Sequence, residues 1–171
     1  NAAVEFFQYF SGWCTKVNGT AFDIRQSGGL MGADLSVHAY TLKEPVGVVG
    51  LIVPWNGPAF NAAAKLAPSL AAGCSSILKP AEETPLSALV IEQVLAEAGV
   101  PDGVVNIVNG HGHTAGQALV DHPDVDKIAF TGSTEVGKGI QRALAGTGKK
   151  LTLELGGKAA NIVFDDAPVD Q

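Results

Sequence analysis

The 171-residue chain is long enough to bury a hydrophobic core, and with 46% hydrophobic and 16% charged residues it is too apolar to be a disordered tail. Its net charge of -6 is not accompanied by any cluster of Lys and Arg, which argues against a nucleic-acid partner. The longest apolar stretches, such as residues 46–53, are too short to span a bilayer, so no membrane association is expected.

The N-terminal part is predicted to form a helix followed by an arm. From residue 20 to residue 44 the sequence is rich in Gly and alternates loosely, as in a β-hairpin that lies outside a core. We therefore predict a helix in residues 1–19, a hairpin arm in residues 20–45 and a third unit in residues 46–171. The helix is expected to end near Gly19 and to carry one apolar stripe, formed by Phe6, Phe10, Trp13, Cys14 and Val17.

Beyond Pro45, strand and helix patterns alternate, which indicates a parallel sheet with right-handed crossovers. The helix that begins at Pro85, with Thr84 as its N-cap, is expected to bury Leu86, Leu89, Val90, Val94 and Leu95. The predicted fold class is α/β, a doubly wound, mostly parallel, Rossmann-like sheet with flanking helices, plus the N-terminal helix and hairpin arm. Strands are predicted at residues 46–53, 75–79, 104–108, 127–130 and 150–155, and the other helices at 58–72, 114–120 and 135–144.

Cysteine usage and the two chain ends give two further expectations. Cys14 and Cys74 form neither a disulfide framework nor a CxxC pair, which is typical of a reducing compartment, so a cytoplasmic protein is expected. The sequence begins without Met and stops soon after an apolar, strand-like run at residues 161–164, so we expect a fragment.

Polar residues follow several of the predicted strands, where a doubly wound sheet binds its ligands. The carboxylate of Glu82 could accept both hydroxyls of a ribose while Lys79 donates to one of them, or the two could form a solvated ion pair. The run from Gly132 to Gly137 could hold a phosphate at a helix N-terminus or form an ordinary turn, and it departs from the G-x-G-x-x-G pattern.

Other post-strand residues suggest catalytic roles, each with a structural alternative. The Asn56 amide could donate to an oxyanion, although the segment around it is also typical of a turn. Glu154 could act as a general base if it were buried, or simply face solvent. His111 and His113 lack a third ligand, so no metal is assigned.

In combination these segments resemble the aldehyde dehydrogenase superfamily. The resemblance runs from about residue 44 to the end of the chain, and several separate motifs occur in the family's order. They are Glu-Pro-Val-Gly-Val at 44–48, Pro-Trp-Asn at 54–56, Leu-Ala-Pro at 66–68, Leu-Lys-Pro-Ala-Glu at 78–82, Phe-Thr-Gly-Ser at 130–133 and Leu-Glu-Leu-Gly-Gly-Lys at 153–158.

The resemblance implies the cofactor, the reaction and the residues that serve each. It implies oxidation of an aldehyde to a carboxylic acid through a thioester, with NAD as cofactor, Asn56 as oxyanion donor and Glu154 as the base for deacylation. A carboxylate at Glu82 would repel a 2′-phosphate, so NAD is expected in preference to NADP. The implied cofactor-binding residues are Val53, Pro54, Trp55, Lys79, Glu82, Gly112, Gly132, Ser133, Val136, Leu155 and Gly156.

The resemblance also has limits and leaves alternatives. The family's nucleophilic Cys lies in a Gly-Gln-x-Cys segment that does not occur in this chain, and Gly57 stands where relatives often carry Phe. Cys14 and Cys74 are each interpreted as small apolar residues and not as the nucleophile. The alternatives are a non-catalytic dinucleotide-binding or structural relative, and a reductase of acyl phosphates or acyl-CoA. The arm lies where the family has a β-hairpin that builds the oligomer interface, so the resemblance implies an oligomerisation arm in residues 20–45 and a homo-oligomer, a dimer or tetramer, for the intact protein.

Overall fold

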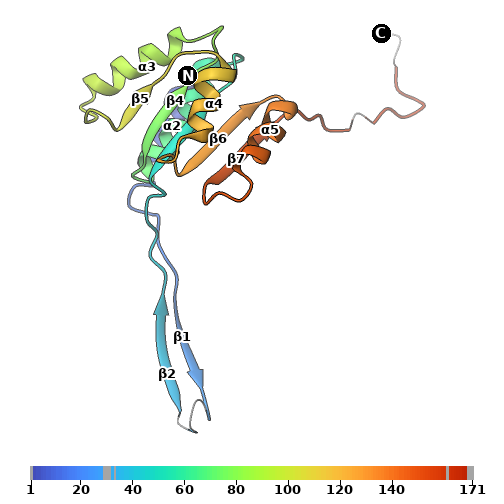
Figure 1. Ribbon diagram of the computed structural model, residues 1–171. Coiled ribbons are helices and arrows are strands. Elements are labelled where there is room, and N and C mark those ends of the chain that lie inside the picture. The colour runs from blue at the N-terminus through green and yellow to red at the C-terminus, as the bar shows by residue number, and fades with distance from the viewer. Residues whose placement is uncertain (1, 29–31, 33, 161, 169–171) are drawn as a thin grey trace.

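The computed structural model describes residues 2–28, 32, 34–160 and 162–168. Helix α1 (Ala2–Ser11) is followed by an antiparallel hairpin of β1 (Ala21–Gln26) and β2 (Leu35–Tyr40). The hairpin projects away from the body of the molecule, whereas α1 packs against helix α2 (Pro58–Ala71) (Figure 1). The two N-terminal elements therefore have different surroundings: the helix packs on the main body, and the hairpin extends away from it.

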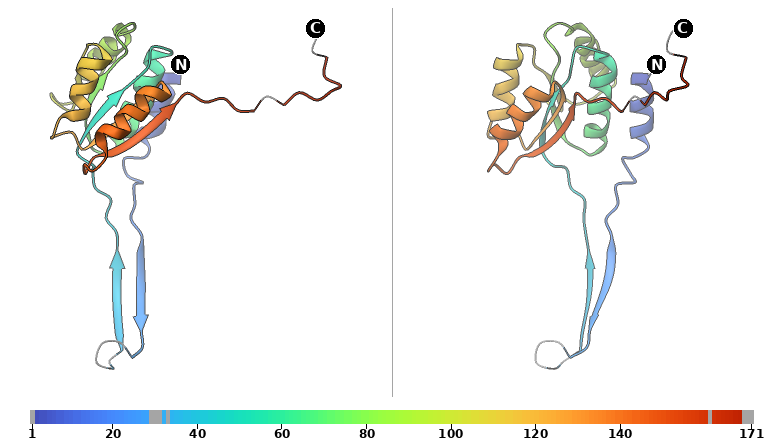
Figure 2. Two further views of the ribbon diagram at one scale, coloured as in Figure 1. Left: turned by 45° about the vertical axis from the view of Figure 1, so that its right-hand side comes forward. Right: turned by 90° about the vertical axis from the view of Figure 1, so that its right-hand side faces the viewer.

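The main body is a parallel sheet of five strands in the order β5-β4-β3-β6-β7, so the predicted fold class is confirmed. Its first three strands are β3 (Val48–Ile52), β4 (Ser75–Lys79) and β5 (Val105–Ile107). Between them lie α2 and α3 (Leu86–Glu97), which cover one face of the sheet (Figure 2).

The second half of the sheet is covered on its other face. A π-helical turn, η2 (Gly112–Gly116), continues into the short helix α4 (Gln117–Asp121). Strand β6 (Lys127–Gly132) and helix α5 (Thr134–Leu144) then lead to the edge strand β7 (Lys150–Leu155). Helix α5 packs on β6 and β7, on the side of the sheet opposite to α2 (Figure 2).

Two hydrophobic cores form because the central strand sends alternate side chains to opposite faces. Leu51 of β3 packs with Leu66 of α2 and Leu78 of β4 in one core. Its neighbour Ile52 packs in the other core with Ile140 and Leu144 of α5. Burial on both faces explains why β3 is an unbroken apolar run in the sequence.

Several local predictions were wrong. Helix α1 ends at Ser11 and not near Gly19, so Trp13 and Val17 lie beyond it and are exposed, as is Cys14. Thr84 does not cap α3, because its hydroxyl donates to the carbonyl oxygen of Trp55 at 3.4 Å and Pro85 occupies the N-cap position. The part of the predicted strand 161–164 that the structure describes, residues 162–164, forms no strand and is exposed, while residue 161 lies outside the described residues.

The buried face of α3 also differs from the prediction. Of the five expected residues only Leu95 packs against the core, together with Ala88 and Ile91. Val90 and Val94 are 58% and 57% exposed. The helix is apolar almost all round, so hydrophobic spacing alone could not distinguish its two candidate faces.

Candidate functional site

The order of the strands places a crevice between β3 and β6. The chain winds from β3 through β4 to β5 in one direction and then returns to β6 on the other side of β3. Because the connections turn to opposite faces at that point, the loops after β3 and β6 diverge at the carboxyl ends of the strands. The opening between them is where an α/β sheet of this kind binds a ligand.

A groove with a cavity volume of about 670 Å³ occupies this position. Its lining includes every residue that the sequence indicated for the catalytic and cofactor sites. These residues come from the ends of β3, β4, β6 and β7 and the loops that follow them, from the first turn of α5, and from Gly112 at the start of η2. Glu83, Thr131 and Lys158 also line it and were not predicted. Each of these three lies inside or beside a post-strand motif, so proximity to those motifs was the signal that could have identified them.

Lys79 and Glu82 form the polar end of the groove. Lys79 is the last residue of β4, and its buried Nζ donates to Glu82 Oε2 at 2.8 Å. The backbone N–H of Gly112 donates to Glu82 Oε1 at 3.2 Å. The hydrogen bond from Lys79, with the bonds from the backbone amides, lowers the pKa of Glu82 to about 2 from 4.5, against the opposing effect of burial. Glu82 is therefore a fixed negative charge at neutral pH.

Ser133 begins the helix on the opposite wall of the groove. Its Oγ accepts a hydrogen bond from the backbone N–H of Val136 at 3.3 Å and so caps α5. The hydroxyl hydrogen of Ser133 remains available to donate into the groove. A Cβ added to Gly132 would lie 2.5 Å from Cζ of Phe130, so only glycine leaves this close approach of backbone and ring undisturbed.

Asn56 is presented by a turn that another asparagine holds. The Asn61 side-chain amide of α2 donates to the backbone oxygens of Asn56 at 2.6 Å and of Gly57 at 3.2 Å. Gly57 adopts a left-handed conformation with φ of 64°, which favours glycine. The side chain of Asn56 itself makes no hydrogen bond within the described part of the chain, so its amide is free to donate. The role of Asn61 was missed because nothing in the local sequence distinguishes it.

Glu154 lies on the edge strand β7 opposite Thr131 of β6 in the parallel register, and its side chain is exposed. The loop that follows is tied to α5, because Thr134 Oγ1 donates to the carbonyl oxygen of Gly156 at 3.2 Å. Glu154 is not buried, so the structure does not meet the condition on which its role as a base was predicted.

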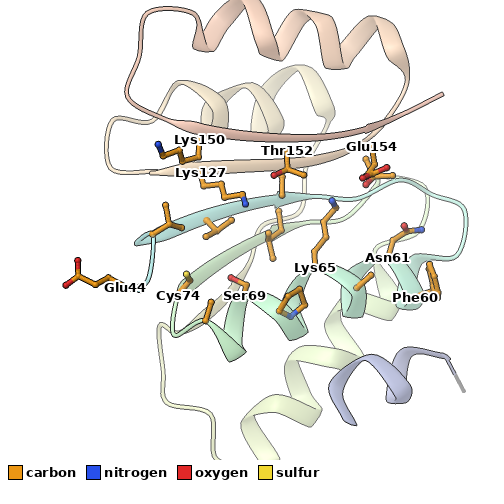
Figure 3. A pocket seen from close by; sticks show the side chains of 18 residues that line it. Glu44, Phe60, Asn61, Lys65, Ser69, Cys74, Lys127, Lys150, Thr152 and Glu154 are labelled. Carbon is orange, nitrogen blue, oxygen red and sulfur yellow. The ribbon is translucent and has the colours of Figure 1, made fainter. Parts of the chain in front are cut away.

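A second hollow of about 730 Å³ lies under β6 and β7 on the face that carries α2 (Figure 3). Lys65 of α2 points toward Thr152 and Glu154 of β7. Burial lowers the pKa of Lys65, and Lys127 lowers it further, while Glu154 opposes both effects. Lys65 stands mid-helix, directly before the Leu-Ala-Pro motif at 66–68, and does not follow a strand, so the search among post-strand residues did not detect it.

Neither cysteine lines the groove. Cys14 is exposed after α1, and Cys74 is buried beside β4, where it lines the second hollow. Among the residues that the structure describes, no group of three or more His, Cys, Asp and Glu side chains could hold a metal ion. Within the same residues, no helix is both long and apolar enough to cross a bilayer.

The chain thus has a doubly wound sheet with an ionised carboxylate and a capped helix at its switch point, an architecture that binds dinucleotides in many proteins. The model of the aldehyde dehydrogenase family matches residues 1–171, and the chain belongs to that family.

The relatives are about three times as long as this chain. An aldehyde dehydrogenase of Enchytraeus buchholzi is 50% identical over 98% of the chain and 32% of its own length. The mouse protein named cytosolic aldehyde dehydrogenase 1 is 47% identical over 98% of the chain and 32% of its length. The solved NAD⁺ complex of a Bacillus cereus aldehyde dehydrogenase is 48% identical, with a TM-score of 0.87 over 99% of the chain and 33% of that structure.

Proposed function

We propose that the complete gene product is an NAD-dependent aldehyde dehydrogenase and that this chain forms its cofactor-binding part. The observation that carries the proposal is the groove at the switch point, lined by Lys79 and Glu82 at one wall and by Ser133 at the other. The Bacillus cereus relative is described as an NAD⁺ complex, which supports the choice of ligand.

The residues of the groove suit an adenine dinucleotide. Its volume of about 670 Å³ lies within the range of roughly 300–1,000 Å³ typical of small-molecule sites. Each carboxylate oxygen of Glu82 accepts one hydrogen bond from the protein and keeps a lone pair for a ribose hydroxyl. Ser133 would donate to the pyrophosphate, and Val136 and Trp55, which are 51% and 65% exposed, would cover apolar parts of the cofactor. The charge of Glu82 disfavours a 2′-phosphate, and hence NADP.

Two residues would act on the substrate side. The free amide of Asn56 would donate to the oxyanion that forms when a thiol adds to the aldehyde. Glu154 would take a proton from the water that releases the acid. In a protein as long as the relatives, the other two-thirds of the chain would close the site and exclude most of the water around Glu154. Bound NAD would accept the hydride. The thiol would come from outside this chain, which has no Gly-Gln-x-Cys segment.

A turnover assay tests the proposal. The complete gene product, given NAD and a simple aldehyde, should produce NADH and free carboxylic acid in equal amounts. Glu154→Gln should lower steady-state turnover at least about 100-fold and leave a first burst of NADH. Glu135→Gln, on the exposed first turn of α5, is the matched control and should keep the wild-type rate. NADH production that requires added phosphate or CoA would contradict the proposal.

We further propose that residues 20–45 form an oligomerisation arm, residues 1–19 an N-terminal helix unit and residues 46–171 the dinucleotide-binding domain. In the register of the hairpin, Phe22 and Ile24 share one face with Val37 and Leu35, and all four side chains are exposed. An isolated two-stranded hairpin is marginal in water, so a second copy of the chain would be expected to cover this apolar face.

We propose the cytoplasm as the location of the protein. The name of the mouse relative includes the word cytosolic, and both cysteines of this chain are free thiols. Fractionation of the source cells followed by immunodetection should find the protein with cytosolic markers, and recovery in an organelle or secreted fraction would contradict the proposal.

A further inference from the structure

A second basic side chain lies beside the carboxylate of Glu82. Nδ1 of His111 is 3.7 Å from Glu82 Oε1, an ion-pair distance, while Lys79 Nζ is bonded to Oε2 on the other side. His111 follows β5 and Glu82 follows β4, and these two strands are paired, so their carboxyl-end loops lie side by side. The carboxylate is thus positioned between one permanent cation and one group that can become a cation.

The side chain of His111 is in contact with the solvent. Its side chain is 69% exposed, and imidazole is the side chain that normally changes charge between pH 5 and pH 8. The ring of His113 stacks on it with centroids 5.5 Å apart and planes at 14°. The charged side chains that line the groove next to this position are Lys79, Glu82, Glu83, Glu154 and Lys158.

We propose that His111 is a third side chain of the adenosine-ribose site and determines how strongly that site discriminates against a 2′-phosphate. This inference rests on the proposed function, because it assigns the ribose to Glu82. With His111 neutral, the three groups have no net charge, and a 2′-phosphate is repelled by the adjacent carboxylate of Glu82. With His111 protonated, the three groups carry a net positive charge and offer the phosphate an additional N–H donor.

Protonation of His111 weakens the binding of NAD and strengthens the binding of NADP. It attracts Oε1 of Glu82, which competes with the hydroxyl of NAD for that oxygen, and it attracts the phosphate of NADP. The preference for NAD therefore narrows as the pH falls. Because the ring is largely exposed, solvent screens the interaction, and the expected change in the ratio of the two dissociation constants is about fivefold.

Calorimetry of the complete gene product with NAD and with NADP, at pH 8 and at pH 6, tests the inference. The variants are His111→Gln and, as a matched control, His113→Gln, which removes the neighbouring histidine but keeps the one beside Glu82. A 2′-phosphate changes its own charge near pH 6, so the quantity compared is the pH effect in the wild type relative to that in His111→Gln.

The expected result is that the Kd ratio of NADP to NAD falls about fivefold more between pH 8 and pH 6 in the wild type than in His111→Gln. His113→Gln should behave as the wild type does. If NAD binds but the Kd ratio changes with pH by the same factor in the wild type and in His111→Gln, this inference alone is overturned. Loss of the pH effect on the ratio in His113→Gln only would overturn it too. Absence of NAD binding at both pH values would overturn the proposed function as well.

Discussion

Hydrogen-bond donors from neighbouring segments hold the carboxylate of Glu82 in the groove. Its two carboxylate oxygens are bonded to Lys79 at the end of β4 and to the Gly112 amide at the start of η2. The pKa of Glu82, lowered to about 2, expresses the strength of that arrangement. A carboxylate fixed in this way loses little further freedom when a ribose binds.

Glu82 should contribute to stability only where it is ionised. Its pKa is lower in the folded protein than the usual 4.5, so its contribution is present above about pH 4.5 and is lost as the pH falls toward 2. In urea unfolding, Glu82→Gln should be less stable than the wild type at pH 7, by about 1 kcal/mol or less because the side chain is partly exposed. The difference should vanish near pH 2. Glu83→Gln, which removes neither bond, is the control, and an equal, equally pH-dependent loss in both variants would contradict this account.

Asn61 and Asn56 should have opposite phenotypes. Asn61→Ala removes two hydrogen bonds that hold the turn and should lower the free energy of unfolding by about 1–2 kcal/mol. Asn56→Ala removes a side chain without a hydrogen-bond partner within the described part of the chain and should cost less than about 0.5 kcal/mol, although it should impair turnover. Urea unfolding of both variants measures the difference. Equal losses of stability would mean that Asn61 does not hold the turn.

Among elements, the packing of α5 on β7 positions both Ser133 and the loop after Glu154. The helix approaches the strand closely at Gly137, where an added Cβ would lie 2.3 Å from Cδ2 and 3.2 Å from Cγ of Leu155. Two residues further along the same helix, Gly139 faces open space. The close contact at Gly137 sets the separation between α5 and β7.

Substituting these two glycines should therefore give opposite results. Gly137→Ala should destabilise the protein by about 1–3 kcal/mol, because the whole side chain of Leu155 must move. Gly139→Ala should stabilise it by about 0.5–1 kcal/mol, through the higher helix propensity of alanine. Thermal or urea unfolding compares the two variants directly. A stabilising effect of alanine at residue 137 would show that the helix does not contact the strand so closely.

The alternation of elements and the grouping of post-strand residues were predictable from the sequence, because strand and helix periodicities are local and the carboxyl ends of parallel strands meet at one edge. Features that depend on tertiary packing were not predictable from the sequence. The buried face of α3 was predicted wrongly because Val90 and Ile91 are equally apolar. Likewise, the hydrogen bonds of Asn61 and the burial of Lys65 depend on which segments meet in space, which spacing along the chain does not record.

At the scale of the whole molecule, large apolar surfaces remain uncovered. The hairpin exposes Ile24 and Val37 on one face, and its opposite face carries Asp23 paired with His38 at 2.6 Å. The hairpin therefore has one apolar face and one polar face, as the proposed oligomerisation arm requires.

If the arm mediates assembly, charge on its apolar face should prevent it. The double variant Ile24→Asp/Val37→Asp should reduce the mass of the complete gene product, measured by light scattering, to that of a single chain. The matched control, Ala21→Asp/Ser36→Asp, also introduces two negative charges, on the opposite face of the hairpin, and should keep the wild-type mass. An unchanged mass in the first variant would exclude the apolar face from the interface.

The central claim is that the groove at the carboxyl ends of β3, β4 and β6 binds the cofactor. A crystal structure of the complete gene product with NAD tests it most directly. The adenosine-ribose hydroxyls should lie within hydrogen-bonding distance of the Glu82 carboxylate, with the pyrophosphate beside Ser133. Cofactor bound instead in the hollow beside Lys65, or on the far side of the sheet, would contradict it.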